Sequence, residues 1–86
     1  MKEIITKRHF YIGENANVHI VCALEKHGDE MYIVFYYSGK YGDEEICRKE
    51  YDGMSSRSFS KESEVLLEKV KQRALRLFKC DEKNKE

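Results

Sequence analysis

The segment from Val18 to Tyr37 constrains the fold of this chain more than any other part of it. Two apolar stretches flank Gly28-Asp29, a pair of residues typical of a tight β-turn. With this pair at the tip of a hairpin, Cys22 lies opposite Phe35, and the register of both strands follows. The segment therefore predicts a β-hairpin that is apolar on both of its faces.

Side chains of a strand alternate between the two faces of a sheet, so the register divides this hairpin into two sets. The first set is wholly apolar and consists of Val18, Ile20, Cys22, Leu24, Ile33, Phe35 and Tyr37. The second set is mixed and consists of His19, Val21, Ala23, Glu25, Tyr32, Val34 and Tyr36. The first face predicts an ordinary core, whereas the apolar centre of the second face requires cover, from a partner or from the N-terminal or Ser-rich segment of the chain itself.

One helix is predicted near the C-terminus, beginning around Phe59 with Ser60 as its N-cap. Glu62 and Glu64 fall in its first turn, where the helix dipole favours acidic side chains. Apolar residues recur at helical spacing, at Leu66, Leu67, Val70, Ala74, Leu77 and Phe78. We expect this stripe to pack on the first face of the hairpin.

Two further strands are indicated, from Ile4 to Ile12 and from Glu45 to Tyr51. Ile4, Phe10 and Ile12 share one parity and should share a face. The fold class is therefore α+β, with a three- or four-stranded antiparallel sheet and one C-terminal helix on one face. We expect a single domain over residues 1–80 and a flexible polar tail over residues 81–86.

The composition limits the classes of function that we expect of this chain. The 86 residues support one domain, and sixteen basic residues balance sixteen acidic ones, so net charge favours neither nucleic acid nor membrane. No apolar run approaches the roughly 20 residues of a membrane helix, and the N-terminal residues lack the pattern of a signal peptide. Cys22, Cys47 and Cys80 lack CxxC spacing, which is typical of free thiols in a reducing compartment. We therefore expect a cytoplasmic protein without membrane contact.

Catalytic, cofactor and metal signatures are not predicted. Cys22 points to the core and His19 to the opposite face, so these two cannot form a nucleophile and its base. His9 and His19 could face each other across neighbouring strands, but two ligands do not make a structural metal site. We expect no catalytic residue, no cofactor and no metal.

The helix carries a basic strip, because Lys69, Arg73, Arg76 and Lys79 fall on one side of it. Such a strip can bind phosphates or an acidic surface of a partner. Cations near the C-terminus of a helix also complement its dipole while they remain solvated. Both interpretations remain open at this point.

The order of three antiparallel strands and one helix, with Ser58-Phe59-Ser60-Lys61-Glu62 leading into the helix, loosely resembles DNA-binding domains of the AP2 and phage-integrase N-terminal type. The resemblance covers about forty residues and implies a sheet packed on one helix. In that family the sheet face reads the major groove with arginine and tryptophan. This chain instead has Val21, Ala23, Val34 and Tyr36 there, so the resemblance implies architecture more than DNA binding.

The sequence therefore predicts a small, non-enzymatic protein-binding module of the adaptor or inhibitor type. Its contact surface would be the second face of the hairpin, and its partner another protein, a second copy in a homodimer, or both. The expected contact residues are Val21, Ala23, Tyr32, Val34 and Tyr36, with Lys69, Arg73 and Arg76 as a charged rim. The alternative is a nucleic-acid-binding domain that uses the helix strip and the sheet tyrosines.

Overall fold

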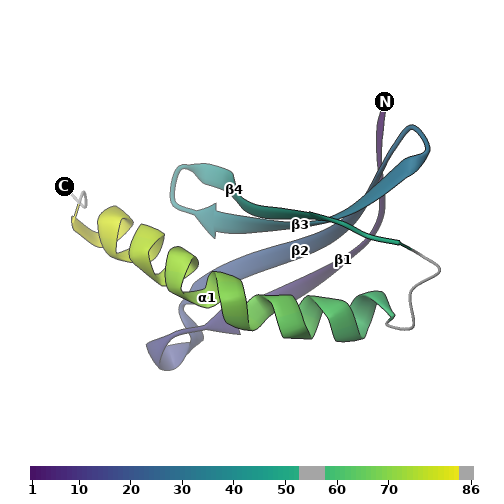
Figure 1. The fold of residues 1–86 in the computed structure, drawn as a ribbon. Helices are drawn as coiled ribbons and strands as arrows, with labels where there is room; N and C mark the ends of the chain where they lie inside the picture. Colours follow the sequence, from purple (N-terminus) through teal and green to yellow (C-terminus); the bar gives the residue numbers. More distant parts are fainter. Residues whose placement is uncertain (53–57, 84–86) are drawn as a thin grey trace.

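The computed structural model describes residues 1–52 and 58–83 and has the predicted α+β fold. One antiparallel sheet contains four strands in the order β1-β2-β3-β4, so each strand pairs with its neighbour in sequence. The helix crosses one face of this sheet and leaves the other face uncovered (Figure 1). The elements are β1 (Lys2–Ile12), a short 3-10 turn (Glu14–Ala16), β2 (Val18–His27), β3 (Glu30–Gly39), β4 (Gly42–Glu50) and α1 (Phe59–Lys83).

The central hairpin has the register expected from the sequence. Gly28 and Asp29 form its tip, and Gly28 takes a positive φ of 64° that glycine adopts without a steric penalty. Cys22 lies opposite Phe35, and the pairing continues in both directions along β2 and β3. The two sets of side chains therefore point to opposite faces of the sheet, as predicted.

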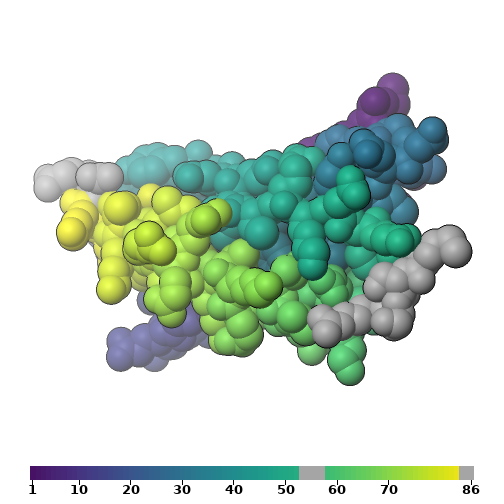
Figure 2. Space-filling view, viewed as in Figure 1, coloured from purple at the N-terminus to yellow at the C-terminus, as the bar shows by residue number. Residues whose placement is uncertain are grey.

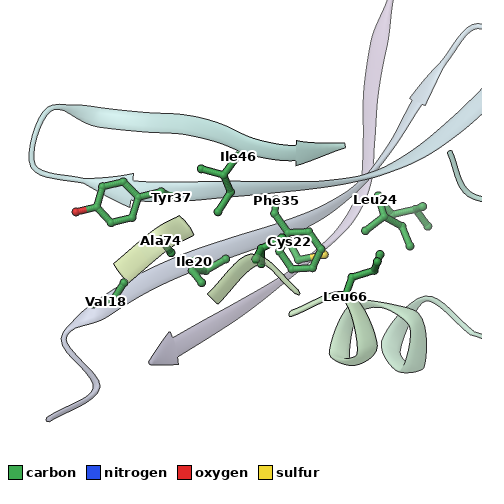
Figure 3. Close-up of a cluster of buried hydrophobic side chains, with 11 residues drawn as sticks. Val18, Ile20, Cys22, Leu24, Phe35, Tyr37, Ile46, Leu66 and Ala74 are labelled. Carbon is green, nitrogen blue, oxygen red and sulfur yellow. The ribbon is translucent and has the colours of Figure 1, made fainter. Parts of the chain in front are cut away.

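The core lies between α1 and the first set of side chains (Figure 3). Ile20, Ile33 and Phe35 are fully buried there, and burying each such side chain contributes about 1.5–3 kcal/mol. From the helix, Leu66, Val70 and Ala74 are buried, which confirms the predicted apolar stripe. The opposite side of the helix remains open to solvent along its length (Figure 2).

Two β-bulges change which face some residues occupy. In β4 the register shifts beside Ile46, so that both Ile46 and its neighbour Cys47 lie on the helix face, although they are adjacent in sequence. In β1 the shift falls at Ile5 and moves Ile4 to the uncovered face, opposite Glu25. The expectation that Ile4 shares a face with Phe10 and Ile12 is therefore wrong, because strict alternation does not survive an inserted residue.

The ends of the helix also differ from those expected. The helix begins at Phe59, and the hydroxyl of Ser58 accepts a hydrogen bond from the Lys61 amide at 3.3 Å. Ser58 is therefore the N-cap, and the assignment of that role to Ser60 is wrong. At the other end the helix continues to Lys83, past the expected domain boundary at residue 80. Residues 84–86 of the expected tail lie outside the described part of the chain.

Polar contacts fasten both ends of the helix to the sheet. Near its start, Arg8 of β1 donates to the Ser60 carbonyl at 2.8 Å and to the Ser63 hydroxyl at 2.9 Å. Near its end, the Tyr37 hydroxyl donates to Asp81 Oδ2 at 2.7 Å. Within residues 1–52 and 58–83, no helix is long and apolar enough to cross a bilayer.

Candidate functional site: the helix-free face of the sheet

The uncovered side of the sheet, here called the open face, is the largest surface without a packed element. Register places five carboxylates and three permanently charged cations on it, with Lys2 and Lys7 on β1 and three of the carboxylates on β4. The open face is therefore more basic along one edge and more acidic along the other. Its residues are Lys2, Ile4, Lys7, His9, Tyr11, His19, Val21, Ala23, Glu25, His27, Glu30, Tyr32, Val34, Tyr36, Ser38, Asp43, Glu45, Arg48 and Glu50.

The apolar centre predicted as the contact core is buried within the single chain. Val34 and Ala23 have no exposed surface, and Val21 is 8% exposed. The helix lies on the other face, so the long side chains around these residues must cover them. Arg48 stands directly opposite Val34, and its guanidinium lies 5.3 Å from the centre of the Tyr32 ring. A partner would thus meet the half-buried tyrosines and the charged side chains before it met the aliphatic ones.

A buried carboxylate organises one half of the open face. Glu25 is completely buried, and its two oxygens accept hydrogen bonds from His27 Nε2 at 2.9 Å and from the Tyr36 hydroxyl. The Lys2 ammonium lies 3.9 Å from the same carboxylate. Because every partner comes from the open face itself, the network fixes Tyr36 and His27 in place. We call these four side chains the Glu25 network.

The network sets the protonation of Glu25 and Tyr36. Burial by itself raises the pKa of Glu25, but the hydrogen bonds from Tyr36 and His27, with Lys2 and Arg48 nearby, outweigh it and leave that pKa below its ordinary value. The pKa of Tyr36 is raised, first by burial and then by its bond to the carboxylate. Glu25 is therefore an ionised acceptor and Tyr36 a neutral donor near neutral pH. Neither group is poised to exchange a proton with a substrate.

A cluster of aromatic side chains occupies the other half of the open face. The ring nitrogens His9 Nδ1 and His19 Nε2 are 3.0 Å apart, and the two imidazoles stack at a centroid distance of 5.2 Å. The Tyr11 ring stacks on His19 at 4.7 Å and is 60% exposed. We call these three residues the His9–His19–Tyr11 cluster. It presents flat, accessible rings beside the more basic edge of the sheet.

The helix cations predicted as a rim lie apart from the open face, since the helix covers the other side of the sheet. Lys69 and Arg76 are exposed on α1. Arg73 reaches β4 and donates to the carbonyl of Ile46, at the position of the bulge. Arg73 therefore satisfies a backbone acceptor on an edge strand, a structural use that the sequence did not indicate.

The surroundings of the three cysteines give little support for nucleophilic or metal chemistry. Burial raises the pKa of the Cys22 thiol to about 12, with Arg8 lowering it and Cys47 raising it to smaller extents. Such a thiol is protonated at neutral pH and is not a nucleophile. Cys47 is half-buried and Cys80 exposed, and both are free. In the described part of the chain, no three side chains of His, Cys, Asp or Glu gather in a way that could hold a metal ion.

Sequence reasoning missed the Glu25 network and Tyr11. Glu25 stood on the correct face, but its complete burial depends on Lys2, which lies before the β1 bulge, and on Tyr36 across the hairpin. Hydropathy gives no signal for a buried glutamate. The available signal was register alone: Glu25, His27 and Tyr36 fall on one face of paired strands.

Comparisons of the chain with protein-family models, with curated proteins and with solved structures found no match.

Proposed function

We propose that this chain is a small, non-enzymatic protein-binding module, of the adaptor or inhibitor type, which contacts a partner protein through the open face. The observation that carries the proposal is a broad sheet face without a covering element, on which internal contacts hold tyrosines and imidazoles in fixed positions. Ordered aromatic side chains are favoured at protein interfaces, because little further freedom is lost when a partner binds.

The size of the face supports the same proposal. The molecule measures 45 × 26 × 15 Å, so it is a thin slab with two broad sides. A standard protein interface takes about 800 Å² from each partner, which a side of this size can supply. The separation of basic β1 from acidic β4 would give such an interface its orientation.

Nucleic-acid binding is the second candidate and has weaker support. The open face carries more carboxylates than cations, which opposes a polyphosphate backbone. On the helix, Arg73 is engaged with the Ile46 carbonyl, which leaves Lys69, Arg76 and Lys79 as the accessible cations of the strip.

Position-specific photocrosslinking tests the proposal. The photoreactive analogue p-benzoylphenylalanine replaces Tyr11 on the open face, and in a control chain it replaces Gln72, which is exposed on the helix. After irradiation in the native cell, we expect one protein to be linked to the first chain and not to the second. Excess untagged wild type should prevent this link, whereas a Lys7→Glu/Tyr11→Ala double variant should compete poorly.

Two outcomes would contradict the proposal. Equal labelling of the same proteins from both positions would indicate contact without a preferred face. A crosslinked species that disappears on nuclease treatment would favour the nucleic-acid candidate, which predicts steep weakening with salt.

A further inference from the structure

His9 and His19 join β1 to β2 on the open face through one hydrogen bond between their rings. The bond links His9 Nδ1 to His19 Nε2 at 3.0 Å, with the ring centres 5.2 Å apart and the ring planes inclined by 21°. At these distances both nitrogens lie close to the line between the ring centres, so one ring donates its N–H to the lone pair of the other. Whichever ring is the donor, the bond requires one nitrogen that carries no hydrogen.

The number of protons on the two rings decides whether that acceptor nitrogen exists. With both rings neutral, one donates and the other accepts. One added proton makes an imidazolium, which still donates to the neutral ring, in a stronger and charge-assisted bond. A second added proton puts a hydrogen on both nitrogens, so that two donors and two positive charges would face each other at 3.0 Å. The doubly protonated pair must therefore separate.

The position of the two rings lets them take up protons and move. His9 is exposed and His19 half-buried, so protons reach both rings from solvent. Tyr11 lies directly opposite His19 in the register, and its ring stacks on that imidazole at 4.7 Å with 8° between the planes. A displacement of His19 therefore changes the position of the exposed Tyr11 ring as well.

The charged groups around the pair are of both signs. Cations oppose a further positive charge on the imidazoles and carboxylates favour it, and the carboxylate of Asp81 is already engaged by Tyr37. The surroundings thus neither prevent protonation nor hold a doubly charged pair together. The titratable and charged groups that line the hollows beside the two rings, or stack on them, are Lys7 and Tyr11 of β1, Tyr36 and Tyr37 of β3, Lys40 of the following turn, Asp43 of β4, and Asp81 and Glu82 of α1.

We propose that the bond between His9 and His19 is a proton-dependent link between β1 and β2, which holds at neutral pH and breaks in mild acid, when both imidazoles are charged. Imidazole is the side chain that ordinarily changes its charge between about pH 5 and 8. Breaking the bond releases His19 and the Tyr11 ring stacked on it, and it leaves two positive charges beside the more basic edge of the sheet. The effect on a partner rests on the proposed function, whereas the link itself does not.

NMR spectra of the histidine rings in the whole chain test the link. Long-range proton–nitrogen spectra follow each ring nitrogen from about pH 8 to about pH 4.5, together with the ring signals of Tyr11. In wild type the two imidazoles should take up protons in two steps, at least about tenfold apart in proton concentration, because the first proton strengthens the bond and the second breaks it. The Tyr11 signals should move mainly with the second step.

Single-histidine variants provide the comparison. In His9→Asn and in His19→Asn the remaining imidazole should take up its proton in one step, whereas the control His27→Asn, which alters the Glu25 network, should retain both steps. Amide spectra of the same samples should stay dispersed through the second step, which separates opening of the link from unfolding of the chain.

Three results would overturn the proposal. Each histidine would titrate in wild type as it does when the other is asparagine, the Tyr11 signals would ignore the second step, or ring-to-ring contacts of His9 and His19 would persist at about pH 4.5. A failure of photocrosslinking at Tyr11 would instead count against the proposed function, and it would leave these spectra unchanged.

Discussion

Glu25 is the residue whose environment departs furthest from that of an ordinary strand glutamate. An ionised side chain without exposure is costly unless its lone pairs are satisfied. Here His27, Tyr36 and Lys2 supply the compensation. The network therefore ties the N-terminal end of β1 to the central hairpin, on the side of the sheet that the helix does not reach.

Glu25→Gln tests this role. The amide keeps an acceptor for Tyr36 but loses the charge, and a hydrogen bond to a charged group contributes about 1.5–3 kcal/mol. We expect the free energy of unfolding at pH 7 to fall by about 2 kcal/mol, measured by urea denaturation. The exposed Glu44→Gln serves as the matched control and should stay within about 0.5 kcal/mol of wild type.

The pH dependence gives a second readout of the same variant. The pKa of Glu25 is lower in the folded chain than in the unfolded one. Its contribution is therefore complete above the unfolded value of about 4.3 and is lost as the pH falls through the folded value. The stability difference between wild type and Glu25→Gln should accordingly shrink in acid. A difference that stays constant down to pH 3 would mean that the charge is not responsible.

At the scale of elements, the end of α1 is tied to the sheet through Asp81, whose Oδ2 accepts hydrogen bonds from the Tyr37 hydroxyl at 2.7 Å and from the Lys40 amide at 3.4 Å. Burial and the bond to Asp81 both raise the pKa of Tyr37, so its hydroxyl remains a donor. The backbone of β3 approaches closely at this point, since a Cβ added to Gly39 would overlap the Tyr37 ring and stand 2.8 Å from Asp81 Oδ2. Glycine at position 39 thus gives Tyr37 and Asp81 the space to meet.

A double-mutant cycle measures this anchor. Tyr37→Phe removes the donor hydroxyl, Asp81→Ala removes the acceptor, and the double variant removes both. We expect a coupling energy of about 1–2 kcal/mol from urea denaturation, as for a hydrogen bond to a charged group. Glu82→Ala, one residue further along the helix, should not couple with Tyr37→Phe. Additive effects of the two single changes would show that the bond contributes nothing.

The elements also show how far sequence reasoning reaches. The hairpin register and the helix stripe follow from a glycine turn and from apolar spacing, both of which are local. The bulges at Ile5 and Ile46 do not follow, because an inserted residue is stabilised by packing on distant parts of the chain. Asp81 illustrates the same limit, since a polar residue near a chain end reveals nothing of a tyrosine on another element.

At the scale of the whole molecule, the side chains of the open face determine how much apolar surface it offers to a partner. The sequence predicted a surplus apolar centre, to be covered by another molecule or by the N-terminal or Ser-rich segment of the same chain. In the folded chain Ala23 and Val34 are already inaccessible, beneath polar and aromatic side chains of the same face. The apolar driving force for a homodimer through this centre is therefore small. Partner recognition would depend on Tyr11, Tyr32 and the charged edges instead.

The substitution Val34→Glu distinguishes a Val34 that forms a dimer contact from a Val34 that is buried within the single chain. If Val34 formed an open dimer contact, the variant would be a folded monomer of nearly unchanged stability. Because Val34 is fully buried in the single chain, the new carboxylate should lose its hydration, and Arg48 opposite it is already paired with Glu45. We therefore expect a loss of at least about 3 kcal/mol in the free energy of unfolding.

The matched control is Lys7→Glu, which places a carboxylate at an exposed position of β1, opposite Ala23 on the same face, and should leave the fold intact. Sedimentation equilibrium at tens of micromolar completes the comparison, with wild type and Lys7→Glu both expected as monomers. A wild-type dimer, together with a stable monomeric Val34→Glu, would show that the apolar centre is a dimer interface. That result would mean that the side chains over Val34 move aside when a second copy binds.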